Sequence, residues 1–139
     1  MATKDLINKQ GYIETVSGLG TTLAGQASDT SNERELPLLT QRDVVVEVTV
    51  TFHASADDGL RVRILEGMVS GAIATQPAQG NNAIITLNAG ATERATFYFE
   101  VRSRYYVIEL FNLDSSGVRN ATGISVKVLE FPEQIETYS

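Results

Sequence analysis

A strict alternation of residue types between Val44 and Ala54 constrains this chain more than any other feature. The even-numbered positions hold four valines, a phenylalanine and an alanine, whereas most odd-numbered positions are polar, including Glu47, Thr51 and His53. A helix at about 3.6 residues per turn would scatter these apolar side chains around its circumference, but a strand places them on one face. The sequence therefore predicts a strand with one face on a core and the other toward water or a partner.

A turn and a second alternating segment follow this strand. Residues 55–59 end in Asp-Asp-Gly, a combination that favours a tight turn because the aspartates bond their own backbone and glycine tolerates positive φ. Alternation resumes over residues 60–64, with Arg61 and Arg63 on the polar face. We expect the two strands to form a hairpin in which these arginines face Glu47.

The same pattern recurs along the rest of the chain. Further strands are expected at residues 72–75, 83–87, 93–102, 105–113 and 122–131. Turn residues separate them about every 8–12 positions, and no segment has helical periodicity. This spacing predicts an all-β protein, an antiparallel β-sandwich of seven or eight strands. A jelly roll and an immunoglobulin-like Greek key both fit, because strand order is not encoded in the alternation.

The first 41 residues have a different composition. Residues 17–35 are rich in Gly, Ser, Thr and Ala and show no sustained period, which is typical of a segment that cannot bury enough surface to order itself. We expect an extended N-terminal arm over 1–41 that binds a partner, a sandwich domain over 42–131 and an exposed acidic tail over 132–139. The arm's partner-binding residues are expected to be its apolar ones: Tyr12, Ile13, Val16, Leu19, Leu23, Leu36, Leu38 and Leu39.

Composition excludes several classes of function. The chain of 139 residues has no cysteine and one histidine, which excludes disulfides, thiolate chemistry and a multi-histidine metal site within one chain. No apolar run approaches about 18 residues, and the N-terminus has no signal-peptide core, so we expect synthesis in the cytoplasm and no membrane partner. The net charge of −6 argues against a nucleic-acid partner, since phosphate binding needs clustered Lys and Arg.

Two acidic groups are candidate sites. Asp57, Asp58 and Asp114 lie in turns, and they would offer oxygen ligands to Ca²⁺ if those turns met at one end of the sandwich; aspartate is also simply a common turn residue. Glu100 and Glu109, expected on neighbouring strands, would need a cleft and a defined separation to act as a glycosidase pair. Surface carboxylates are far commoner, so we predict no catalytic residue, no cofactor and no metal beyond this weak Ca²⁺ candidate.

Two stretches carry a resemblance to a known group of proteins. The sequences FHASADDGLRV (52–62) and RYYVIELFNLDSSG (104–117) resemble small β-sandwich domains of bacteriophage virion proteins, nearest in character to capsid decoration (cement) proteins. The resemblance covers residues 42–131 and includes no motif from which a functional residue can be carried over. It implies a non-enzymatic virion protein, made in the host cytoplasm, that binds the major capsid protein or another virion protein. It also implies a homo-oligomer, which we expect to be a trimer.

Two alternatives remain open from the sequence. A tail or baseplate accessory protein would look the same. The ADDGLRV turn (56–62) is also similar to one in a sugar-binding sandwich family in which paired aspartates bind calcium, although that family's domain is larger and usually contains tryptophan, which this chain lacks. A carbohydrate- or receptor-binding module would need exposed aromatic side chains, for which the candidates are Tyr98, Tyr105, Tyr106 and Tyr138.

Overall fold

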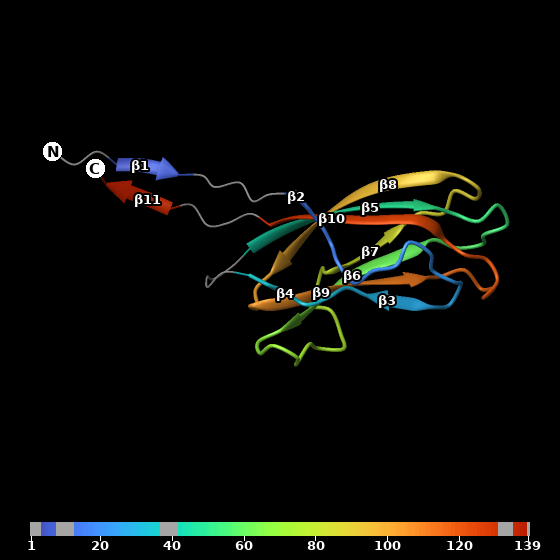
Figure 1. The fold of residues 1–139 in the computed structure, drawn as a ribbon, viewed down its shortest axis with the longest axis horizontal. Coiled ribbons are helices and arrows are strands. Elements are labelled where there is room, and N and C mark those ends of the chain that lie inside the picture. Colours follow the sequence, from blue (N-terminus) through green and yellow to red (C-terminus); the bar gives the residue numbers. More distant parts are fainter. Residues whose placement is uncertain (1–3, 8–12, 37–41, 131–134, 139) are drawn as a thin grey trace.

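The structure is a computed structural model that describes residues 4–7, 13–36, 42–130 and 135–138. Its regular elements are all β-strands (Figure 1). The strands are β1 (Lys4–Ile7), β2 (Ile13–Thr15), β3 (Ser28–Thr30), β4 (Arg34–Glu35), β5 (Arg42–Thr51), β6 (Leu60–Gly67), β7 (Asn82–Ile85), β8 (Thr92–Val101), β9 (Tyr105–Asn112), β10 (Thr122–Glu130) and β11 (Ile135–Tyr138). In this described part of the chain, no helix is long and apolar enough to cross a membrane.

Two antiparallel sheets face each other and form the sandwich. Sheet I has the order β2-β10-β5-β8, and sheet II has the order β3-β9-β6-β7, with β4 also paired to β9. The chain changes sheet after β2, β4, β5, β7, β8 and β9, so most consecutive strands lie in opposite sheets. Because β3 and β4 both pair with β9 along the same edge, these nine strands fill the eight strand positions of a jelly roll. The predicted antiparallel sandwich is therefore confirmed, and the strand order selects the jelly roll from the two topologies that the sequence left open.

The core lies between the sheets and is built by the alternation described above. The even-numbered valines of β5, from Val44 to Val50, have no exposed surface, and Leu60, Val62 and Ile64 of β6 oppose them from the other sheet. Each fully buried side chain of this size contributes about 1.5–3 kcal/mol relative to an exposed one. The core is contiguous and includes residues from both sheets.

The expected hairpin between β5 and β6 is wrong. β5 pairs with β10 and β8, whereas β6 pairs with β9 and β7, so residues 52–59 connect the two sheets. Arg61 and Arg63 consequently face Glu109 of β9 rather than Glu47, with nitrogen–oxygen distances of 3.3 and 2.6 Å. Alternation specifies which face of a strand is buried but not which strand lies beside it. Two strands with one apolar face each can share a core equally well from opposite sheets.

The described part of the expected arm also differs from its prediction. Residues 13–36 supply β2 to sheet I and β3 and β4 to sheet II, and Val16, Leu23 and Leu36 are buried in the common core. The sandwich therefore begins well before residue 42. These strands are only two or three residues long, and β2 and β3 lie at sheet edges, where most side chains remain exposed. Short, polar edge strands commonly protect a sheet against aggregation. Because their composition resembles that of a loop, the sequence did not reveal them as strands.

The first and last strands form a separate ribbon. β1 and β11 pair antiparallel from Lys4 with Tyr138 to Ile7 with Ile135, and neither joins sheet I or sheet II. Part of the segment expected to be an exposed acidic tail therefore forms a strand paired with β1. The ribbon lies beyond one end of the sandwich (Figure 1), which we call the terminal end. The β6–β7 and β8–β9 connections lie at this end, and the β2–β3, β5–β6, β7–β8 and β9–β10 connections lie at the opposite, distal end.

Candidate functional site

At the distal end, the two acidic turns meet as the calcium hypothesis required. The backbone N–H of Asp57 donates to Asp114 Oδ2 at 3.2 Å, and the backbone N–H of Ser115 donates to Asp57 Oδ1 at 2.9 Å. The Ser115 hydroxyl bonds Asp57 Oδ2, and Arg119 Nη1 lies 3.4 Å from the same oxygen and 3.7 Å from Asp114 Oδ1. Asp58 is not part of this cluster, since its Oδ1 accepts the next backbone N–H at 2.7 Å.

Protein donors already use these carboxylate oxygens. The bonds from the Ser115 side chain and backbone, together with the charge of Arg119, hold the pKa of Asp57 below its usual range. Asp114 is buried, and its Oδ1 accepts the backbone N–H of Ser116 at 2.9 Å. Within the residues that the structure describes, no three His, Cys, Asp or Glu side chains are grouped to hold a metal ion. The cluster is built to fasten the β5–β6 connection to the β9–β10 connection.

The remaining candidates for chemistry are spread over the molecule. Glu100 lies on β8 in sheet I and Glu109 on β9 in sheet II, so the expectation that they occupy neighbouring strands is wrong. Each carboxylate is paired with an arginine instead: Glu100 with Arg102 at 2.7 Å and Glu109 with Arg63 at 2.6 Å. His53 is exposed, and its Nδ1 accepts the backbone N–H two residues further on at 3.0 Å. Glu100 lines a hollow of about 280 Å³ with Glu66 and Arg102, but neither Glu109 nor His53 lies there.

Toward the terminal end, one arginine joins the two sheets. Arg34 of β4 donates to Glu130 of β10 at 2.7 Å through Nε and to Glu14 of β2 at 2.5 Å through Nη2. Its Nε also lies 3.2 Å from the hydroxyl of the buried Tyr106. Desolvation lowers the pKa of Arg34, but the two glutamates outweigh it and raise the pKa overall, while burial raises the pKa of Tyr106. Both groups therefore keep their protons, and the cluster links sheets.

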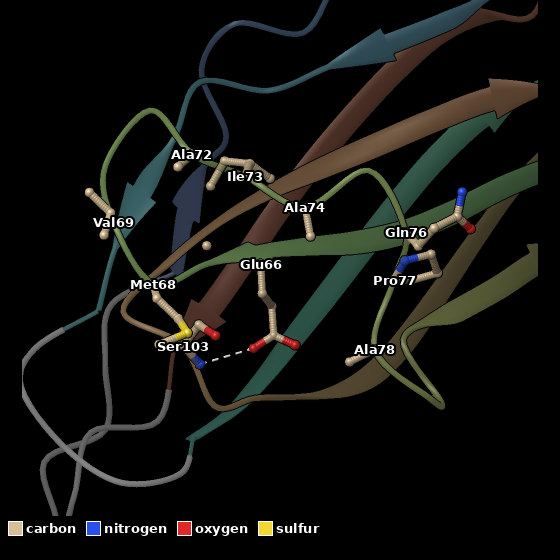
Figure 2. Close-up of a pocket in the computed structure, with 11 residues that line it drawn as sticks. Glu66, Met68, Val69, Ala72, Ile73, Ala74, Gln76, Pro77, Ala78 and Ser103 are labelled. Carbon is tan, nitrogen blue, oxygen red and sulfur yellow. Dashed lines mark hydrogen bonds between the residues drawn. The ribbon is translucent and has the colours of Figure 1, made fainter.

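A large apolar hollow opens at the terminal end. It has a volume of about 650 Å³ and lies between the β6–β7 connection and the β8–β9 turn. Figure 2 shows the Glu66 side chain pointing to Ser103, with the connection passing around the hollow. Glu66 Oε1 accepts the backbone N–H groups of Arg102 and Ser103 at 2.8 and 2.9 Å, which fixes one wall. The other walls are mostly apolar: Met68, Val69, Ala72, Ile73, Pro77 and Ala78.

Sequence reasoning missed this hollow. It predicted a short strand at residues 72–75, whereas the structure has a long connection without a strand from residue 68 to residue 81. The available signal was the pair Met68-Val69, two adjacent apolar residues set between the turn formers Gly67 and Ser70-Gly71. Both are strongly exposed, at 83% and 65% of their surface. Adjacent exposed apolar side chains beside a hollow are typical of a surface that binds something.

The residues proposed as the partner-binding arm have different surroundings from those expected. Val16, Leu23 and Leu36 lie in the sandwich core, and Leu19 packs against it, so they hold the chain to its own fold. Ile13 is exposed over 70% of its surface and remains available to a partner. The other three, Tyr12, Leu38 and Leu39, lie outside the described residues.

The three tyrosines with described side chains, Tyr98, Tyr105 and Tyr106, do not gather on one surface. Tyr106 is fully buried, Tyr105 is half-buried, and Tyr98 is 78% exposed on sheet I. Stacking on a sugar generally uses an exposed aromatic face, and among the residues with described side chains Tyr98 is the one large exposed aromatic. Tyr138 lies in β11, apart from Tyr98. The distal loops, where binding residues of sandwiches often cluster, carry polar side chains that bond one another.

Comparison with known proteins gives likeness in fold alone. No family model matches this chain, and no curated protein matches it in sequence. A chain of the T13 viral particle of infectious bursal disease virus is similar at a TM-score of 0.58, with 15% identity over 88% of this chain. Chains from the Gt and Gx strains of the same virus give TM-scores of 0.57 and 0.52, with 12% and 14% identity over 95% and 94% of this chain.

This chain spans only about a third of those viral chains, at 31%, 38% and 32% of their length. The likeness therefore concerns one β-sandwich within each longer protein. The expected resemblance to virion proteins is supported at the level of architecture: this chain has a viral-capsid-like antiparallel β fold.

Proposed function

We propose that this chain is a non-enzymatic structural protein of a virus particle, a decoration protein that binds the outside of a capsid through its terminal end. The observation that carries the proposal is the jelly-roll strand order of a chain that shares its fold with particle proteins of infectious bursal disease virus. The resemblance of residues 52–62 and 104–117 to bacteriophage virion proteins supports the same class. A tail or baseplate accessory protein would be a structural protein of the same class, with a tail or baseplate protein as its partner instead of the capsid.

The uneven distribution of exposed apolar residues supports attachment at the terminal end. Among the side chains that the structure describes, six large hydrophobic ones are strongly exposed: Ile13, Met68, Val69, Ile84, Tyr98 and Val118. Met68 and Val69 lie at the terminal end, Ile13 and Tyr98 lie on the outward face of sheet I in its half nearer the ribbon, and only Val118 lies in a distal loop. Apolar surface that would be costly in water is favourable against a partner. The distal end is polar, and its charged groups bond one another, which suits a surface that stays in water.

The ribbon formed by β1 and β11 also supports attachment through the terminal end. A two-stranded sheet is marginally stable by itself in water and gains stability when a third strand joins it. β1 and β11 each have one edge that no described strand covers. A strand of a capsid subunit added to either edge would use main-chain hydrogen bonds, a mode that requires no particular side chains. Many copies on one shell would then stabilise it by mass action.

Purified virus particles provide the test. The proposal requires the chain to be found in particles by mass spectrometry and to be located on their outer surface by immunogold labelling. A variant with Met68→Ser and Val69→Ser should bind particles about tenfold more weakly, because two exposed apolar side chains lose their burial against the shell.

Two further variants sharpen this test. Deletion of residues 1–9, which removes β1, should abolish attachment. Val118→Ser, a change of equally exposed apolar surface at the distal end, should bind like the native chain. Absence of the chain from purified particles would refute the proposal. Equal loss from the Val118 variant would refute attachment at the terminal end.

A further inference from the structure

A row of four apolar side chains crosses the outward face of sheet I. Leu129 of β10 is in register with Ile13 of β2 and with Val45 of β5, and Val45 is in register with Tyr98 of β8. Residues directly opposite in antiparallel strands point to the same face, so these four side chains form one line across all four strands. Ile13 and Tyr98 are exposed, and Val45 and Leu129 are half-buried. A continuous apolar line of this kind is unusual on a surface that remains in water.

The next row toward the distal end carries charge at its centre. Lys127 of β10 is in register with Glu47 of β5, and these two residues are flanked by Thr15 of β2 and Thr96 of β8. Lys127 is exposed and makes no ion pair with another described residue, while Glu47 has only a long contact of 4.0 Å with Arg94. A shallow hollow of about 100 Å³ lies between this row and the apolar one. One positive and one negative group are thus available side by side at the middle of the sheet.

We propose that this face pairs with the same face of a second copy of the chain, about a two-fold axis that runs parallel to the strands between β10 and β5. Such an axis reverses the strand order and keeps each row at its own level. Ile13 of one copy would then lie over Tyr98 of the other, and Leu129 over Val45. In the charged row, Lys127 would lie over Glu47 of the other copy in both directions. The face is therefore complementary to itself in shape, polarity and charge.

The alternative two-fold arrangement is unfavourable. In that arrangement the axis is perpendicular to the strands and runs along the apolar row. The charged row of one copy would then lie over the row of the other copy that is next to the apolar row on its terminal side. That row contains Asp43 of β5 in register with Glu100 of β8. Glu47 would then face Asp43 of the second copy, and like charges placed together across an interface are costly. The register of sheet I thus selects the axis parallel to the strands, with the rotation of about 30° that twisted sheets adopt when they pack.

The size of the face suits a reversible pair. Four strands about 4.8 Å apart with a rise of about 3.4 Å per residue make a face of roughly 20 by 30 Å, or about 600 Å² in projection. A standard interface buries about 800 Å² on each partner, so this one belongs to the weaker class. We therefore expect a dimer that dissociates on dilution. This pairing does not depend on the proposed role in a virus particle, and it favours two copies rather than the trimer expected from the sequence.

Charge exchange tests the pairing. By analytical ultracentrifugation across a dilution series, the native chain should sediment as a dimer that dissociates. Lys127→Glu alone and Glu47→Lys alone should each raise the dissociation constant of the dimer about tenfold or more, because each places like charges across the axis. A mixture of the two variants should restore pairing, since every facing pair is then opposite in sign. Mixing cannot repair a defect within either chain, so restoration isolates the contact between copies.

Second variants keep the test decisive if a charge variant fails to fold. Ile13→Ser and Tyr98→Ser change side chains that are 70% and 78% exposed, and they should weaken the dimer while leaving thermal stability nearly unchanged. Val118→Ser, at the distal end, should leave the dimer unaffected. A native chain that stays monomeric to about 1 mM, a trimer, or pairing that the two charge variants leave intact would overturn the inference. None of these outcomes bears on whether the chain is found in virus particles.

Discussion

At the scale of single residues, Arg34 shows how much one side chain in a polar segment can contribute. Its planar guanidinium reaches Glu130 and Glu14 on two strands of sheet I while its backbone belongs to sheet II. Arg34 and Glu130 are mostly buried, with 21% and 19% of their side-chain surface exposed. Removing one member of such a cluster leaves its partners desolvated without a counter-charge, which costs more than the pair itself contributes.

Arg34→Ala should therefore lower the free energy of unfolding by about 2 kcal/mol, less than for a fully buried pair because some water reaches the cluster. Urea denaturation followed by circular dichroism measures this change. Arg104→Ala is the matched control, since Arg104 pairs with Glu35 at 2.5 Å but both side chains are about half exposed. That variant should change stability far less than Arg34→Ala, because water screens an exposed ion pair. Equal effects would show that Arg34 does not link the sheets.

At the scale of elements, the β2–β3 connection is fastened to the β9–β10 connection at the distal end. Leu23 and Ala121 form an isolated β-bridge, and Asn112 Nδ2 donates to the Leu23 carbonyl at 3.0 Å. Gly25 lies so close to the other connection that a Cβ there would be 2.0 Å from the carbonyl oxygen of Ser116. This oxygen belongs to the backbone and cannot move without shifting the loop. The contact makes residues 13–36 part of the sandwich rather than an independent arm.

Gly25→Ala should destabilise the protein by about 2–3 kcal/mol or more, because the added methyl group forces the two connections apart. Gly20→Ala is the control within the same segment, since the nearest heavy atom to its added Cβ lies at 3.6 Å, an ordinary contact. Thermal unfolding of both variants gives the comparison. An arm that did not pack on the sandwich would tolerate both substitutions equally.

At the scale of the whole molecule, the two ends of the sandwich differ in character. The terminal end combines the ribbon, the hollow of about 650 Å³ and exposed apolar side chains, whereas the distal end has loops whose polar groups bond one another. The outward face of sheet I adds a second surface, directed sideways. These surfaces are separate, so a copy can pair with its neighbour through sheet I while its terminal end binds a shell.

The jelly roll also predicts how the chain responds to truncation. Deletion of residues 1–35 removes the edge strands β2 and β3 together with β4, and with them two core residues, Val16 and Leu23. This variant should fail to fold and should lack the dispersed amide resonances of a β-sandwich. Deletion of residues 1–9 removes only β1 and should keep those resonances, because β1 pairs with β11 alone. If the chain that lacks residues 1–35 still folded into a sandwich, the assignment of residues 13–36 to the sandwich would be refuted.

Much of the sandwich was predictable because the information is local. Six strands, β5 to β10, were expected within about three residues of their observed positions. The meeting of Asp57 and Asp114 was also anticipated as a condition for calcium binding. The hydrogen bonds and ion pairs that these carboxylates make were not anticipated. Their partners, Ser115 and Arg119, are recognisable only once the two connections lie together.

What the sequence determined by itself is the class of fold and the buried face of strands with clear alternation, such as β5 and β6, since a period of two is a property of consecutive residues. Only the tertiary structure decided which strands are neighbours. It placed β5 and β6 in opposite sheets, brought the polar segment 13–36 into both sheet edges, and aligned Ile13, Leu129, Val45 and Tyr98 in one row. The physical reason is that register and pairing are set by contacts between residues far apart in the chain, on which local periodicity is silent.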